Sequence, residues 1–249
     1  MLRNTAKWTK IVEALTKLQA PKYIERIVVA FLLGRRLYCD SDDGEKLFPM
    51  TCGVPQGSVL GPLLWLIMYN GVLTLRLPNG VTTIGFADDI GVTIVAKRLD
   101  EIEIYANETI WEINSWLKKS GLLLAEHKTE LVLISKRRKD TTVEIKVGQK
   151  AIYSQESLKY LGAKDKRLNF KKHFECAATK ASSIAVAISR ILPNIGGPRQ
   201  SRRRLISRVV SSVLLYAAPV WATVLENKSN CGKLGMAYRL SALRVCSAY

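Results

Sequence analysis

The chain has 249 residues, of which 48% are hydrophobic, enough to bury the core of one large domain or of one domain with a smaller companion. Lysine and arginine total 38 against 21 acidic residues, which gives a formal net charge of +17. A basic excess of this size favours a polyanionic partner, either nucleic acid or an anionic membrane surface. A basic soluble protein without such a partner is the alternative.

The cysteines and histidines argue against a zinc site. The five cysteines form no C-x-x-C pair, and the chain has only two histidines. The odd number of cysteines and an amphipathic N-terminus without the apolar core of a signal peptide favour an intracellular protein, in the nucleus or the cytoplasm.

The apolar spacing along the first two thirds of the chain predicts helices that alternate with hairpins. The expected elements, in chain order, are helices over 5–18 and 21–34, a hairpin over 37–50, a helix over 62–69, a hairpin of 81–87 with 90–96, a helix over 99–120, short strands at 122–124 and 131–134, and a hairpin of 142–147 with 151–153.

After Lys159 the strand patterns give way to helices, which we expect at roughly 170–192, 198–216 and 233–246. The fold class is therefore α+β followed by a helical module. The uncharged stretch 209–225 has the lowest length that could cross a membrane. Because Ser, Tyr and Pro interrupt it, a buried helix broken near Pro219 is favoured over a membrane segment.

Two adjacent aspartates, Asp88 and Asp89, stand between the strands of the central hairpin. Neighbouring carboxylates repel each other, unless they share a proton or bind a hard cation. Mg²⁺ prefers carboxylate and phosphate oxygens, and two such ions can hold the attacking and leaving oxygens of a phosphoryl transfer. An ordinary turn is the alternative, since Asp is common in turns.

A second unusual stretch, GVPQGSVLGP, spans residues 53–62. Its glycines allow the backbone to approach a ligand closely, its prolines stiffen the loop, and Gln56 offers an amide donor and acceptor. The helix that follows could turn its positive end toward a phosphate. A plain connector between a strand and a helix is the alternative.

Together these stretches resemble the reverse transcriptases of non-LTR (LINE-type) retrotransposons, particularly those of insects. GVPQGSVLGPLLW is similar to motif B, FADD to the metal-binding motif C, GLLLAEHKTELVLIS to motif D, SLKYLG to the primer-grip motif E, and the segment 196–222 to the helical thumb. The resemblance covers nearly the whole chain. It implies a polymerase palm, an antiparallel sheet backed by helices, over residues 1–168 and a helical thumb-like region over 169–249.

The resemblance also implies a role for each matching residue. Asp88 and Asp89 would ligate two Mg²⁺ ions, with Mn²⁺ as a possible substitute, and Lys128 would give a proton to the leaving pyrophosphate. The other implied roles are a nucleotide and template pocket for Pro55, Gln56 and Gly57, the primer grip for Tyr160, Leu161 and Gly162, support of the hairpin for Phe86, and contacts to nucleic-acid phosphates for Arg199, Arg202, Arg203 and Arg204. The implied partners are an RNA template, a DNA primer and deoxynucleoside triphosphates. For Lys128 and the arginines, a solvated surface is the alternative.

The sequence departs from the family in two places. No acid before Gly53 has the apolar strand context of the metal-binding aspartate of motif A, so the chain is expected to begin after that motif and to have little or no polymerase activity alone. After the primer grip, YLGAKDKR is about one residue short, and a one-residue loss reverses the faces of a strand. Two functions stay open, an RNA-directed DNA polymerase domain or a non-catalytic nucleic-acid-binding remnant of a decayed or domesticated element. A membrane-associated basic protein that uses residues 209–225 is a third alternative.

Overall fold

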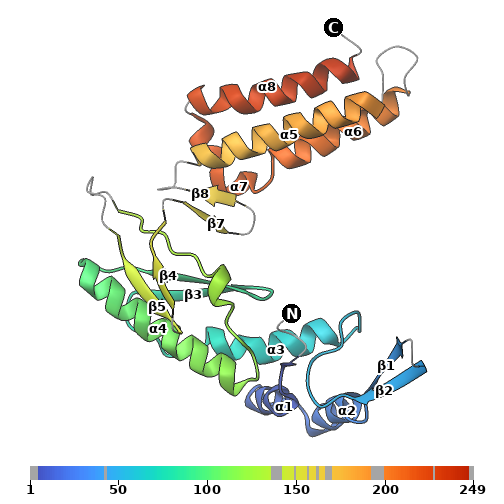
Figure 1. The fold of residues 1–249 in the computed structure, drawn as a ribbon, viewed down its shortest axis with the longest axis vertical. Helices are drawn as coiled ribbons and strands as arrows, with labels where there is room; N and C mark the ends of the chain where they lie inside the picture. Colours follow the sequence, from blue (N-terminus) through green and yellow to red (C-terminus); the bar gives the residue numbers. More distant parts are fainter. Residues whose placement is uncertain are drawn as a thin grey trace. The chain divides into compact units, whose positions relative to one another are not determined.

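A computed structural model describes residues 5–41, 44–135, 142–148, 150–155, 157–160, 163–165, 170–191, 199–226 and 228–246. Helices and small antiparallel sheets follow one another along these residues, so the expected α+β class is confirmed (Figure 1). The chain forms two compact units. Unit 1 holds residues 1–129 and 143–152, and unit 2 holds residues 130–142 and 153–249. The division of the sequence into a palm (residues 1–168) and a thumb-like region (residues 169–249) concerns function, and it stays a prediction.

Unit 1 contains most of the expected hairpins. Its elements are α1 (Trp8–Lys17), α2 (Lys22–Leu32), β1 (Arg36–Ser41), β2 (Gly44–Pro49), α3 (Gly61–Leu73), β3 (Val81–Phe86), β4 (Asp89–Ile94), α4 (Leu99–Lys119), the 3-10 helix η2 (Glu126–Lys128), β5 (Glu144–Val147) and β6 (Lys150–Tyr153), whose last residue already belongs to unit 2. In the part of the chain that the structure describes, β1 pairs only with β2, β3 only with β4, and β5 only with β6. These three two-stranded sheets therefore differ from the one antiparallel sheet expected of a palm.

The expected strand at 122–124 is absent, and at 131–134 only Val132 forms a bridge, parallel to Gln155. The backbone N–H of Leu122 donates to the carbonyl of Leu117 at 2.8 Å, and the Leu122 side chain is buried. Its backbone is thus engaged in ending α4 and cannot join a strand ladder. The apolar triplet 122–124 therefore does not form the strand that its sequence predicts.

The core of unit 1 is built around α3. This helix is apolar on every side, and it buries Leu64, Trp65, Met68, Tyr69 and Val72 against α1, α4 and β3. Full burial of one such side chain contributes about 1.5–3 kcal/mol relative to leaving it in water. Because α3 directly follows the loop of residues 53–61, this core also fixes where that loop ends.

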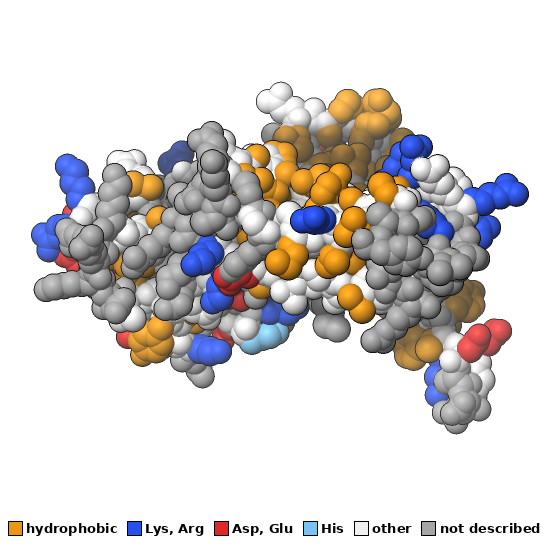
Figure 2. Space-filling view, turned by 90° about the horizontal axis from the view of Figure 1, so that it is seen from above, with side chains coloured by type: hydrophobic (Ala, Val, Ile, Leu, Met, Phe, Trp, Pro, Cys, Tyr) orange, Lys and Arg blue, Asp and Glu red, His pale blue; other side chains and the backbone are white. Residues whose placement is uncertain are grey.

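The surface mixes charge with apolar side chains. On the face drawn in Figure 2, Lys and Arg side chains are more widespread than acidic ones, and hydrophobic side chains lie between them. This agrees with the net charge of +17. The hairpin of β1 and β2 is exposed along its described length, so it adds little to the core.

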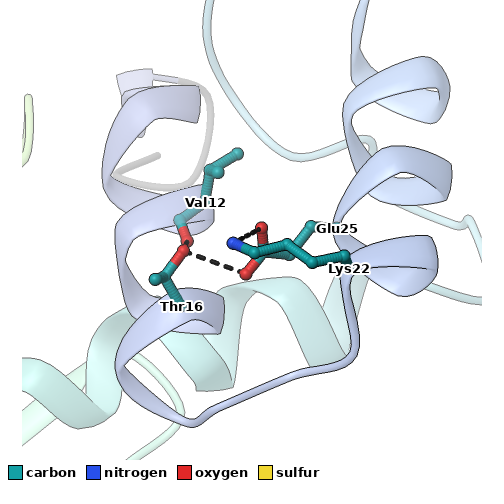
Figure 3. Close-up of polar contacts among 4 residues, drawn as sticks. All are labelled: Val12, Thr16, Lys22 and Glu25. Carbon is teal, nitrogen blue, oxygen red and sulfur yellow. Dashed lines mark hydrogen bonds and ion pairs between the residues drawn. The ribbon is translucent and has the colours of Figure 1, made fainter.

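A polar contact joins α1 to α2 (Figure 3). The hydroxyl of Thr16 lies 3.0 Å from the carboxylate of Glu25 and 3.2 Å from the carbonyl of Val12, and the Lys22 ammonium lies 2.9 Å from Glu25. The hydrogen bond from Lys22, followed by that from Thr16, lowers the pKa of Glu25. This contact holds the two helices together on either side of their short connection.

The strand β5 packs against α4, although the two elements are not adjacent in the sequence. The backbone N–H groups of Glu144 and Lys146 donate to the side chains of Glu103 and Asn107, at 3.2 and 2.8 Å. The alternate residues of this stretch, Val143, Ile145 and Val147, are buried. A segment that returns after residue 142 therefore completes unit 1.

Unit 2 is mainly helical, as expected. Its elements are β7 (Leu158–Tyr160), β8 (Ala163–Asp165), α5 (Lys171–Ile191), α6 (Gln200–Leu214), α7 (Ala218–Trp221), the 3-10 helix η3 (Ala222–Glu226) and α8 (Lys228–Val245). The long helices α5, α6 and α8 pack against one another through small and aliphatic side chains (Figure 1). The helix of the stretch 209–225 is interrupted where expected, since α6 ends at Leu214 and Ala217 has a φ of +58°.

Among the described residues, no single helix has both the length and the apolar character needed to cross a membrane. By length and composition alone, α6 together with residues 218–225 would suffice as a pair bent by 48°.

Candidate functional site

Asp88 and Asp89 lie at the tip of the β3–β4 hairpin, as the sequence predicts. Phe86 pairs with Asp89, so Ala87 and Asp88 form a turn of two residues. Both aspartates are exposed. Ala87 has a φ of +55°, a left-handed conformation that costs a residue with a Cβ about 1–2 kcal/mol. The turn is tight, and it aims its carboxylates at solvent.

Two side chains of helix α3 donate hydrogen bonds to the backbone of this turn. The indole Nε1 of Trp65 donates to the carbonyl of Ala87 at 3.3 Å, and the hydroxyl of Tyr69 donates to the carbonyl of Asp88 at 3.2 Å. The two rings stack with centroids 5.0 Å apart and planes at 23°. Sequence reasoning missed both residues. The available signal was a pair of aromatic residues with polar groups, four positions apart on the helix after motif B.

The register of the hairpin gives it two different faces. Gly85 and Ile90 pair and share the face toward α3, where a Cβ added to Gly85 would lie 3.0 Å from Leu73. Phe86 and Ile84 lie on the opposite face and are 60% and 55% exposed. The exposure of Phe86 excludes its packing in the core of unit 1, and its support of the hairpin stays a prediction.

The loop of residues 53–61 is braced at both ends. At its start, the N–H of Gly53 donates to the carbonyl of Ala6 at 2.8 Å, and the indole of Trp8 donates to the carbonyl of Gly53 at 2.8 Å. At its end, the Ser58 hydroxyl donates to the carbonyl of Pro55 at 2.8 Å and accepts the N–H of Gly61 at 3.0 Å. The loop is therefore held in one shape before it enters α3.

The middle of this loop faces solvent. Gln56 and Gly57 are exposed, Pro55 is half-buried, and Gly57 has a φ of +81°. Trp65 and Tyr69 follow Gly61 by one and two turns of α3, which corresponds to about 6 and 12 Å along the axis. The structure thus attaches the loop and the aspartate turn to the same helix.

The remaining residues singled out in the sequence lie on other elements. Lys128 is exposed at the end of η2, which follows α4. Tyr160 ends β7 in unit 2, and Leu161 and Gly162 lie outside the described residues. In unit 2, Arg199 occupies the N-cap position of α6 without a capping hydrogen bond from its side chain, Arg202 and Arg204 are exposed, and Arg203 is half-buried.

The donor set at the turn suits a hard cation. Carboxylates are the ligands that Mg²⁺ prefers, and an exposed pair leaves room for water and phosphate oxygens. Within the described ranges, His, Cys, Asp and Glu form no group of three or more that could hold a metal ion. Among these residues, Asp88 and Asp89 are thus a pair of carboxylates that no third such side chain joins in a metal-binding group.

Residues 4–164 match the family described as reverse transcriptase (RNA-dependent DNA polymerase). The chain belongs to the reverse transcriptase family. It is 27% identical over 204 residues to a retrovirus-related Pol polyprotein from the type-1 retrotransposable element R1 2 of Nasonia vitripennis, covering 78% of this chain and 50% of that protein. It is also 27% identical over 223 residues to a putative 115 kDa protein in the type-1 element R1DM of Drosophila melanogaster, covering 87% of this chain and 22% of that protein.

These findings confirm the resemblance to non-LTR retrotransposon polymerases of insects. A third relative is the RNA-directed DNA polymerase from the mobile element jockey of Drosophila melanogaster, 27% identical over 156 residues, 59% of this chain and 17% of that protein. This reverse transcriptase chain therefore spans half or less of the length of these relatives. The family match includes the loop of residues 53–61, the aspartate turn, η2 and β7.

Proposed function

We propose that this chain is part of a non-LTR retrotransposon polymerase that extends a DNA primer on an RNA template, and that Asp88 and Asp89 bind its metals. The observation that carries the proposal is the attachment of two exposed carboxylates and a braced, glycine-containing loop to one helix, α3. A plain turn would not need two buried aromatic donors beneath it.

Each residue has a specific task in this proposal. Bound Mg²⁺, or Mn²⁺ in its place, would stabilise charge on the attacking and leaving oxygens of the nucleotidyl transfer. Asp88 and Asp89 hold the cation at the tip of the hairpin. Pro55, Gln56 and Gly57 line the pocket for the incoming deoxynucleoside triphosphate and the template. Lys128 donates a proton to the pyrophosphate.

We assign palm and thumb roles to the two regions of the sequence. Residues 1–168 act as the palm, with Tyr160, Leu161 and Gly162 in the primer grip. Residues 169–249 act as the thumb. Arg199, Arg202, Arg203 and Arg204 contact phosphates of the RNA–DNA hybrid, which positions the duplex without reading its sequence. We place the protein in the nucleus or the cytoplasm, where its nucleic-acid partners occur.

We further propose that this chain alone has little polymerase activity. The described acids before Gly53 lie on α1, on α2, and on the β1–β2 hairpin, away from any strand that pairs with β3 or β4. A two-metal site with one ligand too few loses transition-state stabilisation. The removal of one electrostatic group from an active site costs on the order of 10²–10³ in rate.

The test is primer extension on an RNA template with Mg²⁺ or Mn²⁺. The chain is compared with a version extended before Met1 by an apolar strand that carries an aspartate. We expect synthesis only in the extended version, and its loss there on Asp88→Asn. Robust synthesis by the chain alone would contradict the proposed lack of activity. Synthesis in neither version, with retained binding to an RNA–DNA hybrid, would favour the non-catalytic remnant.

A further inference from the structure

We propose that Trp65 and Tyr69 are positioning residues that set the direction of the Asp88 carboxylate. The inference rests on the proposed function, in which Asp88 binds metal. Each side chain donates a hydrogen bond to a backbone carbonyl of the turn that carries this carboxylate.

The two held carbonyls stand on either side of the same Cα atom. The carbonyl of Ala87 belongs to the peptide plane before Asp88, and the carbonyl of Asp88 belongs to the plane after it. Because a peptide unit is planar, a hydrogen bond to its oxygen restricts the rotation of the whole plane. With both planes restricted, φ and ψ of Asp88 are restricted too, and the Cα–Cβ bond leaves the turn in one direction.

The donors are themselves held rigidly. Trp65 is 2% exposed and Tyr69 is 4% exposed, both within the core cluster of unit 1. They lie four residues apart on α3, on one side of the helix, and their rings stack. The pair therefore acts as one rigid support, and it presents two donors to two consecutive carbonyls.

The turn has a need for this support. Ala87 adopts a left-handed φ of +55°, which a residue with a Cβ keeps only where its surroundings enforce it. The hydrogen bond from Trp65 ends on the carbonyl of that same residue. The two hydrogen bonds also direct the carbonyls of Ala87 and Asp88 toward α3. The carboxylates of the turn are then the oxygens that face solvent.

The test measures binding of Tb³⁺, a hard cation that takes oxygen ligands and emits light when a nearby indole is excited. The full chain is titrated with Tb³⁺ alone, and the emission excited through tryptophan gives the affinity. Trp65→Phe would remove both an indole and one of the two donors, so Asp88→Asn is the variant that identifies the turn as the site observed. Asp88→Asn should weaken binding by tenfold or more, as the proposed function requires.

Tyr69→Phe is the decisive variant, because it removes one hydroxyl and keeps the stacked ring and the indole. We expect about a fivefold or larger rise in the dissociation constant for Tb³⁺, with an unchanged circular dichroism spectrum. The matched control is Tyr23→Phe, at an exposed tyrosine on α2 in the same unit, which should bind as the wild type does. A purely structural role for Tyr69 would change the unfolding midpoint without changing the affinity of the folded protein.

The outcomes separate the inference from the proposed function. If Asp88→Asn leaves Tb³⁺ binding unchanged, metal binding by the turn is contradicted, and the proposed function fails. If Asp88→Asn weakens binding while Tyr69→Phe binds as the wild type does, the positioning role is overturned and the proposed function stands. An equal loss in Tyr69→Phe and Tyr23→Phe also overturns the positioning role.

Discussion

Gly61 lies where the loop of residues 53–61 meets α3, and its missing side chain decides how closely the two can pack. A Cβ at this position would lie 2.5 Å from the backbone carbonyl oxygen of Pro55 and 2.9 Å from the Ser58 hydroxyl. The backbone cannot give way as a flexible side chain can. Gly61 therefore permits the turn that braces Pro55 beside the start of α3.

Gly61→Ala should destabilise the protein by about 1–3 kcal/mol, the usual cost of forcing extra atoms into a packed site. Urea unfolding monitored by fluorescence measures the change. The matched control is Gly235→Ala on α8, where an added Cβ meets nothing within 4 Å. That variant should gain up to about 1 kcal/mol, since Ala favours helix over Gly. A neutral Gly61→Ala would show that the loop is not braced in this way.

At the scale of single residues, the sequence predicted what depends on local chemistry. The position of Asp88 and Asp89 at a hairpin tip follows from the strand pattern on either side of them. The donors Trp65 and Tyr69 could not be predicted in the same way. Their bonds join residues 22 and 19 positions apart, and such contacts depend on how α3 packs under the hairpin. The exposure of Phe86 depends on the register for the same reason.

At the scale of elements, the first turn of α5 carries an ionisable group into a core. His173 is 5% exposed and lies among the rings of Phe170, Phe174 and Trp221. Burial lowers the pKa of His173 from its usual 6.5, and a hydrogen bond with the backbone of Tyr216 opposes this effect in part. The folded state therefore favours the neutral imidazole.

This lowered pKa makes the stability of unit 2 depend on pH. As the pH falls below about 6.5, the unfolded chain binds a proton before the folded chain does, so the free energy of unfolding decreases until the pH passes the folded pKa. Above that pH range, His173 is neutral in both the folded and the unfolded state, so it adds no pH dependence to the free energy of unfolding. We expect this slope in urea unfolding between pH 7.5 and about 5.5, followed by tryptophan fluorescence, to which Trp221 contributes.

His173→Gln should flatten the slope, because it removes the titrating group. His127→Gln on η2 in unit 1 is the matched control and should keep the slope of the wild type. A slope that survives in His173→Gln would assign the dependence to other groups of unit 2.

The elements themselves were largely predictable. Helices with a clear apolar face, such as α1 and α4, lie within three residues of their expected bounds. The failures concern pairing. Whether an apolar triplet such as 122–124 joins a strand depends on where its N–H groups bond, and here Leu122 bonds to the end of α4. The same limit explains why the separate hairpins were expected to form one sheet.

At the scale of the whole molecule, part of the net charge of +17 is concentrated at the start of one helix, where its role in binding can be tested. Helix α6 begins with Arg199, Arg202, Arg203 and Arg204 and has no acid in its first turn. Cations at a helix N-terminus are unfavourable by about 0.3–1 kcal/mol each, because they face the positive end of the helix dipole. A bound polyanion would offset this cost.

Replacing Arg202, Arg203 and Arg204 together by Gln should weaken binding to an RNA–DNA hybrid. It should also lower the salt dependence of log K by about 0.7–0.9 for each phosphate that the protein no longer neutralises. Binding measured at several salt concentrations gives that slope. The folded state should be as stable as before or slightly more stable, because the unfavourable charges at the helix end are removed.

The control replaces three exposed cations of unit 1, Lys17, Arg26 and Arg36, by Gln, which changes the net charge by the same amount. If both triple variants lose equal affinity and equal slope, the binding reflects total charge, and the assignment of these arginines to phosphate contacts is contradicted.

The return of β5 to α4 has a consequence for the newly made chain. Unit 1 needs residues 143–152, yet residues 130–142, which precede them, belong to unit 2. Synthesis runs from the N-terminus at about 5–20 residues each second, and domains usually fold as they emerge. Here the first unit must wait, with α4 uncovered beside Glu103 and Asn107, until β5 has left the ribosome. A single cut after residue 152 would release unit 1 whole, but it would also remove residues 130–142 from unit 2.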